Sequence, residues 1–208
     1  MGYSLKYGLA LVFGLLLCVG VCQAQFRLPP FNVELKVTES LIPNNDNNQS
    51  GAYNLDLLEA TSVYGAAHLQ FGQHIEVGWL YSQSFRGMVK YSNNGGSQSP
   101  PASEKASLLM YGPEARYSTG RGKKTRFSLG INYTQVEFTD DKGGYRLAHK
   151  TNAIGASFGI IRRLSNTIDF NIIELGAKAM LGEKAFWIKS DLMLEVKTGL
   201  IFNFSKRK

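Results

Sequence analysis

The sequence predicts an all-β fold, a closed antiparallel up-and-down transmembrane β-barrel of eight strands. Three observations predict it. Apolar and polar residues alternate with a period of two through most of the chain after residue 25, which is the pattern of strands that have one apolar face. The apolar faces carry almost no charge. Long and short connections mostly alternate between the segments, as they do in barrels that cross a membrane.

The start of the chain has the pattern of an export signal. A small positive charge precedes the apolar run Leu9–Val21. This run is too short for a membrane-spanning helix, which needs about 20 residues. A Cys-Gln-Ala sequence that ends at Ala24 then places small residues where a signal peptidase cuts. We therefore expect residues 1–24 to be a signal peptide, cleaved near Ala24/Gln25, and residues 25–208 to form one barrel domain.

Both cysteines of the chain, Cys18 and Cys22, lie in this signal segment. The expected mature chain therefore has no disulfide, thiol chemistry, Fe–S cluster or cysteine-bound zinc. Two alternatives to cleavage are a short N-terminal anchor and a lipoprotein signal. The length of the apolar run disfavours the anchor. A lipoprotein signal usually has a small residue where Leu17 and Val21 precede the two cysteines.

The chain is basic, with a formal net charge of +7 at pH 7. Proteins that bind nucleic acid gather such charge in a basic helix or stripe, whereas here the charges are scattered singly through the alternating segments. An exported protein also rarely meets nucleic acid. We expect no nucleic-acid partner. The positive charges instead suit attraction to anionic lipid headgroups.

Eight segments have strand patterns and are bounded by clusters of Gly, Asn, Ser and Pro. In order, they are Phe31–Thr38, Tyr53–Phe71, His74–Lys90, Ala106–Tyr117, Thr125–Phe138, Ala148–Ile161, Thr167–Met180 and Trp187–Phe204. Six of these segments have a clear apolar face. It consists of Val33, Leu35 and Val37 in the first segment, of Ile75, Val77, Trp79 and Tyr81 in the third, and of Leu109, Tyr111, Ala115 and Tyr117 in the fourth. It consists of Phe127, Leu129, Ile131 and Tyr133 in the fifth, of Ile154, Ala156, Phe158 and Ile160 in the sixth, and of Leu192, Leu194, Val196, Leu200, Phe202 and Phe204 in the eighth. The seventh segment is mixed, because Glu174 and Lys178 share a face with the apolar residues Ile168, Phe170 and Ile172.

The connections follow a rhythm. The long ones are residues 39–52, 92–105 and 140–147, and the short ones are 72–73, 118–124 and 162–166. The last connection, at 182–184, breaks the rhythm because it is short where a long loop is expected. This rhythm predicts tight turns on the periplasmic side and surface loops on the other side.

A soluble sandwich or barrel also alternates, so the choice of a membrane barrel needs further support. The polar faces are rich in Gly, Ser and Ala, which suits the narrow interior of an eight-stranded barrel. A charge on the lipid side costs about 2–4 kcal/mol at the midplane. The clearest exception is Glu59, which we expect above the membrane at the loop end of its strand. Aromatic residues also gather near the segment ends, where membrane interfaces lie.

The last segment carries the sharpest motif, formed by Lys197, Gly199, Phe202 and Phe204. It resembles the C-terminal signal by which the outer-membrane assembly machinery recognises barrel substrates. The chain is similar in pattern to small Bacteroidetes-type outer-membrane barrel proteins and to the membrane domains of the OmpA and OmpX families. This resemblance implies a place in the cell outer membrane of a Gram-negative bacterium, with lipid and the assembly machinery as partners.

Two features depart from the family pattern. The chain continues past the final aromatic residue with Ser205–Lys208. Pro113 interrupts the fourth strand, where a closed barrel has no free edge to accommodate a residue without an N–H. We expect a β-bulge at this proline.

Charged residues fall on the expected inward faces. They are Asp56, Glu76, Glu114, Arg116, Arg126, Glu174, Lys178, Glu195 and Lys197. Both signs occur, so we expect ion pairs that fill the interior. The rival interpretation is a gated path for an ion or solute, although eight strands are too few for a porin channel.

Catalytic, cofactor and metal sites are not indicated. The three histidines, His68, His74 and His149, have no metal-ligand spacing. We expect the first two to be polar residues beside a turn. Some small outer-membrane barrels modify lipid A with a histidine near the rim, which His149 resembles in position, with Asp140, Asp141 and Thr151 near it in sequence. No nucleophile is identifiable beside it.

The sequence therefore predicts an integral outer-membrane barrel without catalysis, whose role is structural or is carried by contacts of its loops with surface partners. One alternative is a barrel that binds or transports a small apolar ligand. The other is a lipid A-modifying enzyme.

Overall fold

A computed structural model describes residues 29–43, 53–93, 104–120, 123–142, 145–182 and 191–204, with the backbone alone at 53–58, 88–93, 104–105, 140–142 and 145–148. The chain forms eight strands: β1 (Phe31–Pro43), β2 (Tyr53–Phe71), β3 (Ile75–Asn93), β4 (Glu104–Ser118), β5 (Thr125–Lys142), β6 (Tyr145–Arg163), β7 (Ile168–Leu181) and β8 (Leu192–Asn203). Among the described residues no helix is long and apolar enough to cross a membrane.

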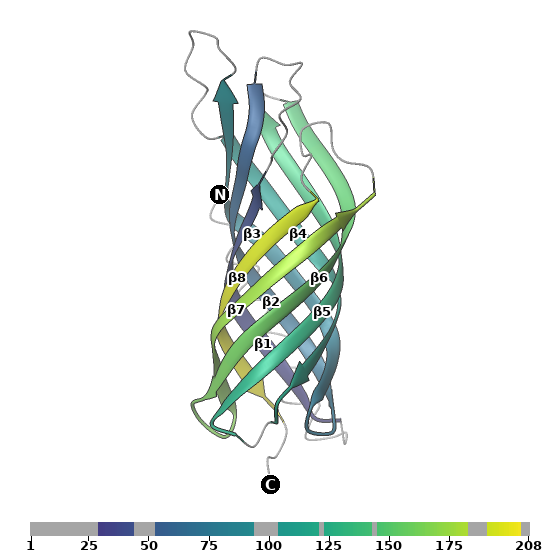
Figure 1. Cartoon of the computed structure of the whole chain (residues 1–208), viewed down its shortest axis with the longest axis vertical. Coiled ribbons are helices and arrows are strands. Elements are labelled where there is room, and N and C mark those ends of the chain that lie inside the picture. Colours follow the sequence, from purple (N-terminus) through teal and green to yellow (C-terminus); the bar gives the residue numbers. More distant parts are fainter. Residues whose placement is uncertain are drawn as a thin grey trace.

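The strands close into one barrel in the order β1 to β8 (Figure 1). Each strand is antiparallel to the next, and β1 pairs with β8 from Asn32↔Asn203 to Leu41↔Leu194. Phe31 and Phe204 reinforce this closing seam, because their rings stack with centroids 4.9 Å apart. The predicted closed, antiparallel, up-and-down barrel of eight strands is confirmed.

Several strands are longer than the sequence pattern predicts. β1 continues to Pro43, so the predicted loop 39–52 begins inside a strand. The predicted loop 140–147 is also wrong, because β5 ends at Lys142 and β6 starts at Tyr145. The predicted start of the last strand at Trp187 and most of the turn 182–184 lie outside the described residues.

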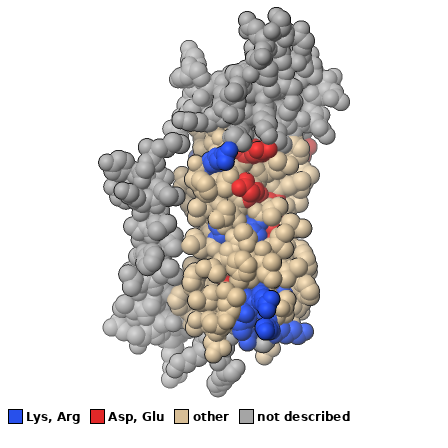
Figure 2. Space-filling view, turned by 90° about the vertical axis from the view of Figure 1, so that its left-hand side faces the viewer, with Lys and Arg blue, Asp and Glu red and all other residues tan. Residues whose placement is uncertain are grey.

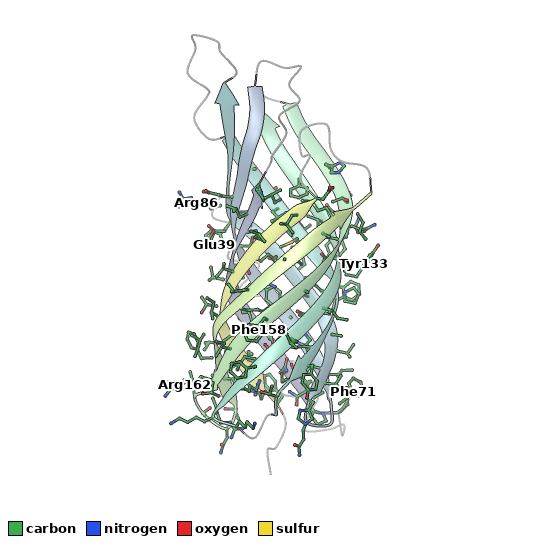
Figure 3. All side chains as sticks on the ribbon, viewed as in Figure 1. Glu39, Phe71, Arg86, Tyr133, Phe158 and Arg162 are labelled. Atoms are coloured by element: carbon green, nitrogen blue, oxygen red, sulfur yellow. The ribbon has the colours of Figure 1, made fainter. Side chains whose placement is uncertain are left out.

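The outward face of the barrel carries an apolar band that surrounds the half nearer the short turns. Ile131 in β5 is 65% exposed and Leu129 is 57% exposed. Each of the eight strands carries exposed large apolar side chains, and Figure 3 shows such side chains projecting outward from the wall. The inward residues between them are buried and mostly polar. The apolar faces predicted for the first, third, fourth, fifth, sixth and eighth strands point outward.

The amphipathic pattern inverts toward the opposite end of the barrel. There, the inward residues form an apolar cluster of Ile42, Ala60, Leu108, Met110, Val136, Phe138, Ala153 and Met193. The outward residues at this end include Glu39, Glu59, Glu137 and Lys150. Because the alternation continues with its polarity reversed, the strands extend beyond the apolar band. Glu59 lies in this extension, as predicted for the loop end of its strand.

A β-bulge in β7 explains the mixed pattern of that strand. The register shifts by one residue against both neighbours, between Asn171 and Glu174 toward β8 and between Ile160 and Ile161 of β6. Ile172 and Ile173 therefore both point outward. The predicted sharing of one face by Glu174 and Ile172 is wrong, because the bulge reverses the alternation between them.

The bulge expected at Pro113 is absent. Pro113 pairs in register with Trp79 of β3. Toward β5 the pairing stops at Tyr111↔Gln135 and resumes at Glu114↔Asn132, with the register unchanged. A proline has no N–H to donate, so the ladder is interrupted on one side without an inserted residue.

Candidate functional site

The interior of the turn-end half contains a dense group of buried charges. Among the described side chains, six carboxylates and five cations are buried there, together with His68. The carboxylates are Glu34, Glu76, Glu114, Asp169, Glu174 and Glu195, and the cations are Lys36, Arg116, Arg126, Lys178 and Lys197. We call this group the interior charge network. The near balance of sign matters because a buried charge is tolerated when an opposite charge and hydrogen bonds offset its desolvation.

Glu174 of β7 lies at the centre of the network. Its carboxylate accepts hydrogen bonds from Lys36 Nζ at 2.7 Å and from Lys197 Nζ at 3.2 Å. Asn171 Nδ2 donates a third hydrogen bond at 2.9 Å, and Arg116 Nη2 is 3.8 Å away. One carboxylate thus joins β1, β4, β7 and β8 across the interior.

A second centre forms around Arg116 of β4. Its guanidinium pairs with Glu34 and, at 3.4 Å, with Glu114. Glu114 also accepts a hydrogen bond from Tyr64 Oη at 2.6 Å and lies 3.0 Å from His68 Nε2. Lys36 Nζ lies 2.5 Å from Glu34 Oε2 and connects the two centres.

The network extends to both sides of these centres. Glu195 Oε2 lies 3.3 Å from Lys197 Nζ and 3.7 Å from Lys178 Nζ. Nearer the turns, Arg126 pairs with Asp169 at 2.9 Å, and Asn203 donates to the same carboxylate at 3.0 Å. Because residues of β1, β2, β4, β5, β7 and β8 take part in these contacts, the network cross-links most of the barrel wall.

Small inward residues provide the room for these long side chains. A Cβ at Gly155 of β6 would lie 2.6 Å from Asn132 Oδ1 and 2.7 Å from Lys178 Cγ. A larger residue would displace the Lys178 stem. The richness of the polar faces in Gly, Ser and Ala, visible in the sequence, has this cause.

The predicted interior charges lie where the sequence pattern places them. Glu76, Glu114, Arg116, Arg126, Glu195 and Lys197 are all buried on the inward face, as are Glu174 and Lys178. The side chain of Asp56 lies outside the described part of the structure.

Several network members were missed by sequence reasoning. Glu34 and Lys36 alternate with valine and leucine in the first strand, so the same pattern could have identified them. The bulge of β7 separates Asp169 from Glu174, so regular alternation did not show that both side chains point inward. His68, expected to be a polar residue beside a turn, is instead buried, with Nδ1 3.1 Å from Asn32 Oδ1.

The residues of the predicted assembly motif lie at the closing seam between β8 and β1. Gly199 packs against β1 so closely that a Cβ there would lie 2.2 Å from the Leu35 carbonyl oxygen. Phe204 donates its N–H to the Phe31 carbonyl at 3.0 Å. Lys197 points into the interior, whereas Phe202 is half-buried at an outward position.

The contacts within the network favour a structural role over metal binding or catalysis. Glu34, His68 and Glu76 offer ligand atoms within 4.8 Å of one another, which is a possible arrangement for a metal. However, Lys36 and Arg116 already contact Glu34, and their positive charges oppose a bound cation. Among the described residues, both ring nitrogens of His68 contact Asn32 or Glu114 and are not directed at a nucleophile.

No protein-family model matches the sequence, and no curated protein is significantly similar to it. Solved structures do share its fold. Neisserial surface protein A has a TM-score of 0.59 at 13% identity, over 84% of this chain and 97% of that one. The outer membrane protein OprG of Pseudomonas aeruginosa has a TM-score of 0.56 at 10% identity, over 85% and 96%. The Ail protein of Yersinia pestis, in complex with a heparin analogue, has a TM-score of 0.51 at 7% identity, over 85% and 100%.

These identities are low, so the similarity concerns the fold. It agrees with the closed eight-stranded topology and with the outward apolar band. The chain therefore has the fold of the small transmembrane β-barrels found among outer-membrane proteins, and the predicted similarity is confirmed at that level.

Proposed function

We propose that the chain is an integral barrel protein of the Gram-negative cell outer membrane, with a structural or surface-interaction role and no catalysis. The observation that carries the proposal is the outward apolar band around a polar, charged interior. A soluble monomer rarely exposes a contiguous apolar patch larger than a few hundred Å². A barrel in lipid needs this arrangement because lipid contacts its outer wall.

The filled interior supports a structural role over conduction. The interior charge network occupies the turn-end half, and the buried apolar cluster with Met110 and Phe138 occupies the other half. An eight-stranded barrel has an interior just wide enough for its side chains. Contacts with partners then fall to the connections at the end opposite the short turns, which face outward in barrels of this class.

Export and assembly form part of the same proposal. Residues 1–24 act as a cleaved signal peptide, and Lys197, Gly199, Phe202 and Phe204 are recognised by the barrel assembly machinery. The position of the motif at the closing seam supports this role, since the last strand must remain accessible until the barrel closes. A Bacteroidetes-type origin remains a prediction.

The inward apolar cluster favours a second candidate, a barrel that binds a small apolar ligand. Its members are tightly packed, because Ile42, Val136 and Met193 have no exposed surface. A ligand would have to displace them, so we rank this candidate second. The lipid A-modifying alternative gains no support, since the Thr151 hydroxyl donates to the Leu181 carbonyl at 2.5 Å and is not directed at His149.

The proposal is tested by cell fractionation and by electrophoresis with and without heating. We expect the protein in the outer-membrane fraction, with a band whose mobility changes on boiling, because a closed barrel resists detergent until heated. A soluble periplasmic protein without a mobility change would contradict the proposal.

A further inference from the structure

An apolar groove lies on the outer wall beside the short turns. It has a volume of about 330 Å³ and is lined by Tyr117, Thr119, Phe127, Leu129 and Phe158. Tyr117, Leu129 and Phe158 are lateral neighbours on β4, β5 and β6. Phe127 stacks on Phe158 with ring centroids 5.9 Å apart. The groove is therefore a shaped depression in the apolar band, with aromatic sides.

The backbone around Phe127 gives the groove a fixed end. The Phe127 N–H donates to Thr119 Oγ1, and the Thr119 N–H donates to the Phe127 carbonyl, both at 3.0 Å. This pair of hydrogen bonds holds the start of β5 against the end of β4. The backbone that carries Thr119 and Phe127, two of the lining residues, is thus fixed in the folded wall.

Positive charge lies next to this groove. Lys123, Lys124 and Arg162 are exposed, and Arg163 is half-buried. Arg162 is the register partner of Thr125, two residues from Phe127 along β5. The Arg163 N–H donates to the Lys124 carbonyl at 2.8 Å, which holds the β4–β5 turn beside the end of β6. Figure 2 shows Lys and Arg side chains gathered at this end of the barrel.

Three of these cations have no acidic partner among the described residues. Lys123, Lys124 and Arg162 form no ion pair within the described part of the chain. The outward carboxylates among the described residues all lie toward the opposite end, and they are Glu39, Glu59, Glu137 and Asp191. An apolar groove that ends at several unpaired cations matches a molecule with an apolar chain and an anionic head.

We propose that this groove and its cations bind an anionic glycerophospholipid of the membrane leaflet at the turn end. An acyl chain lies along Tyr117, Leu129 and Phe158, and the phosphate contacts Lys124 and Arg162. Lysine and arginine side chains near a membrane surface extend their charged ends toward the headgroups. This inference rests on the proposed membrane location, and it adds a preferred lipid and a fixed place on the wall.

The test uses a tryptophan in the groove as a reporter of nearby lipid. The variant Phe158→Trp is made with Trp79→Phe and Trp187→Phe, and it is folded into phosphatidylcholine vesicles. Quenching of its fluorescence is measured with bromine-labelled phosphatidylglycerol or bromine-labelled phosphatidylcholine at equal mole fraction. We expect the anionic lipid to associate at least about fivefold more strongly, which is what one cation contributes at such a surface.

Two variants control this result. Lys124→Gln with Arg162→Gln should bring the two lipids close to parity at the Phe158→Trp reporter. The second control is Leu69→Trp, made with Trp79→Phe and Trp187→Phe and with Phe158 retained. It reports from an outward position beside the β2–β3 turn, whose residues Gly72–His74 include no Lys or Arg. It should show little preference between the lipids.

Equal quenching by the two lipids at position 158 would overturn the inference and leave the membrane proposal standing. A preference that survives the double substitution, or that is as strong at position 69, would also overturn it. If neither lipid quenches either reporter, the outer wall is not in lipid and the proposed function fails as well.

Discussion

Glu174 is the residue on which most of the interior charge network converges. Removing its charge leaves Lys36 and Lys197 buried with less compensation. Breaking a buried ion pair by removing one partner is strongly destabilising, whereas exposed pairs contribute little. Single residues in the interior therefore matter far more for stability than charged residues on the outer rim.

We predict that Glu174→Gln lowers the free energy of unfolding by about 3–5 kcal/mol. Urea unfolding in lipid vesicles, followed by tryptophan fluorescence, measures the change. Glu137→Gln is the matched control, because Glu137 forms its ion pair with Lys150 at 2.7 Å on the outer rim. It should change stability little. Equal effects of the two substitutions would show that the network does not brace the barrel.

The sequence predicts which face an interior charge occupies, but it does not predict the partner of that charge. The inward position of Glu114 and Arg116 follows from alternation alone. Their partners do not, because alternation places a side chain on a face but does not say which distant strands meet across the interior. The contact between Glu174 and Lys36 joins β7 to β1, and it requires the closed barrel to exist.

In strand β7, a local irregularity keeps the apolar side chains outward and the polar side chains inward. Its bulge puts two consecutive isoleucines on the outer wall and keeps Asn171 and Glu174 inside. If the same residues alternated regularly with no bulge, Asn171 and Glu174 would lie on opposite faces of the wall. Sequence alternation misassigned this strand because a one-residue shift moves every following side chain to the other face.

Deleting Ile173 should therefore be tolerated. The shortened strand would alternate regularly, with Asn171 and Glu174 inside and Ile172 outside. Deleting Leu175 instead would keep the bulge and turn Lys178 toward the outer wall. We predict a heat-modifiable, folded band for the first variant and none for the second. Loss of folding in both variants would contradict this account of the bulge.

The whole molecule is divided along its axis by the inversion of its amphipathic pattern. The sequence predicted the barrel and its strand number, because charge-poor alternating faces recur along the chain. It did not predict how far the strands extend. On β5, for example, the outward residues from Phe127 to Tyr133 are apolar, and further along the strand the inward Val136 is apolar. No break in hydrophobicity therefore marks the end of the apolar band.

A spin label at two heights on β5 tests whether lipid surrounds this apolar band. The expected mature chain lacks cysteine, so Leu129→Cys and Glu137→Cys each give one labelling site in a barrel folded into vesicles. We predict that the label at 129 collides readily with dissolved oxygen and is shielded from a water-soluble nickel chelate. The label at 137 should show the reverse. A label at 129 that the nickel chelate reaches as easily as the label at 137 would contradict the membrane barrel.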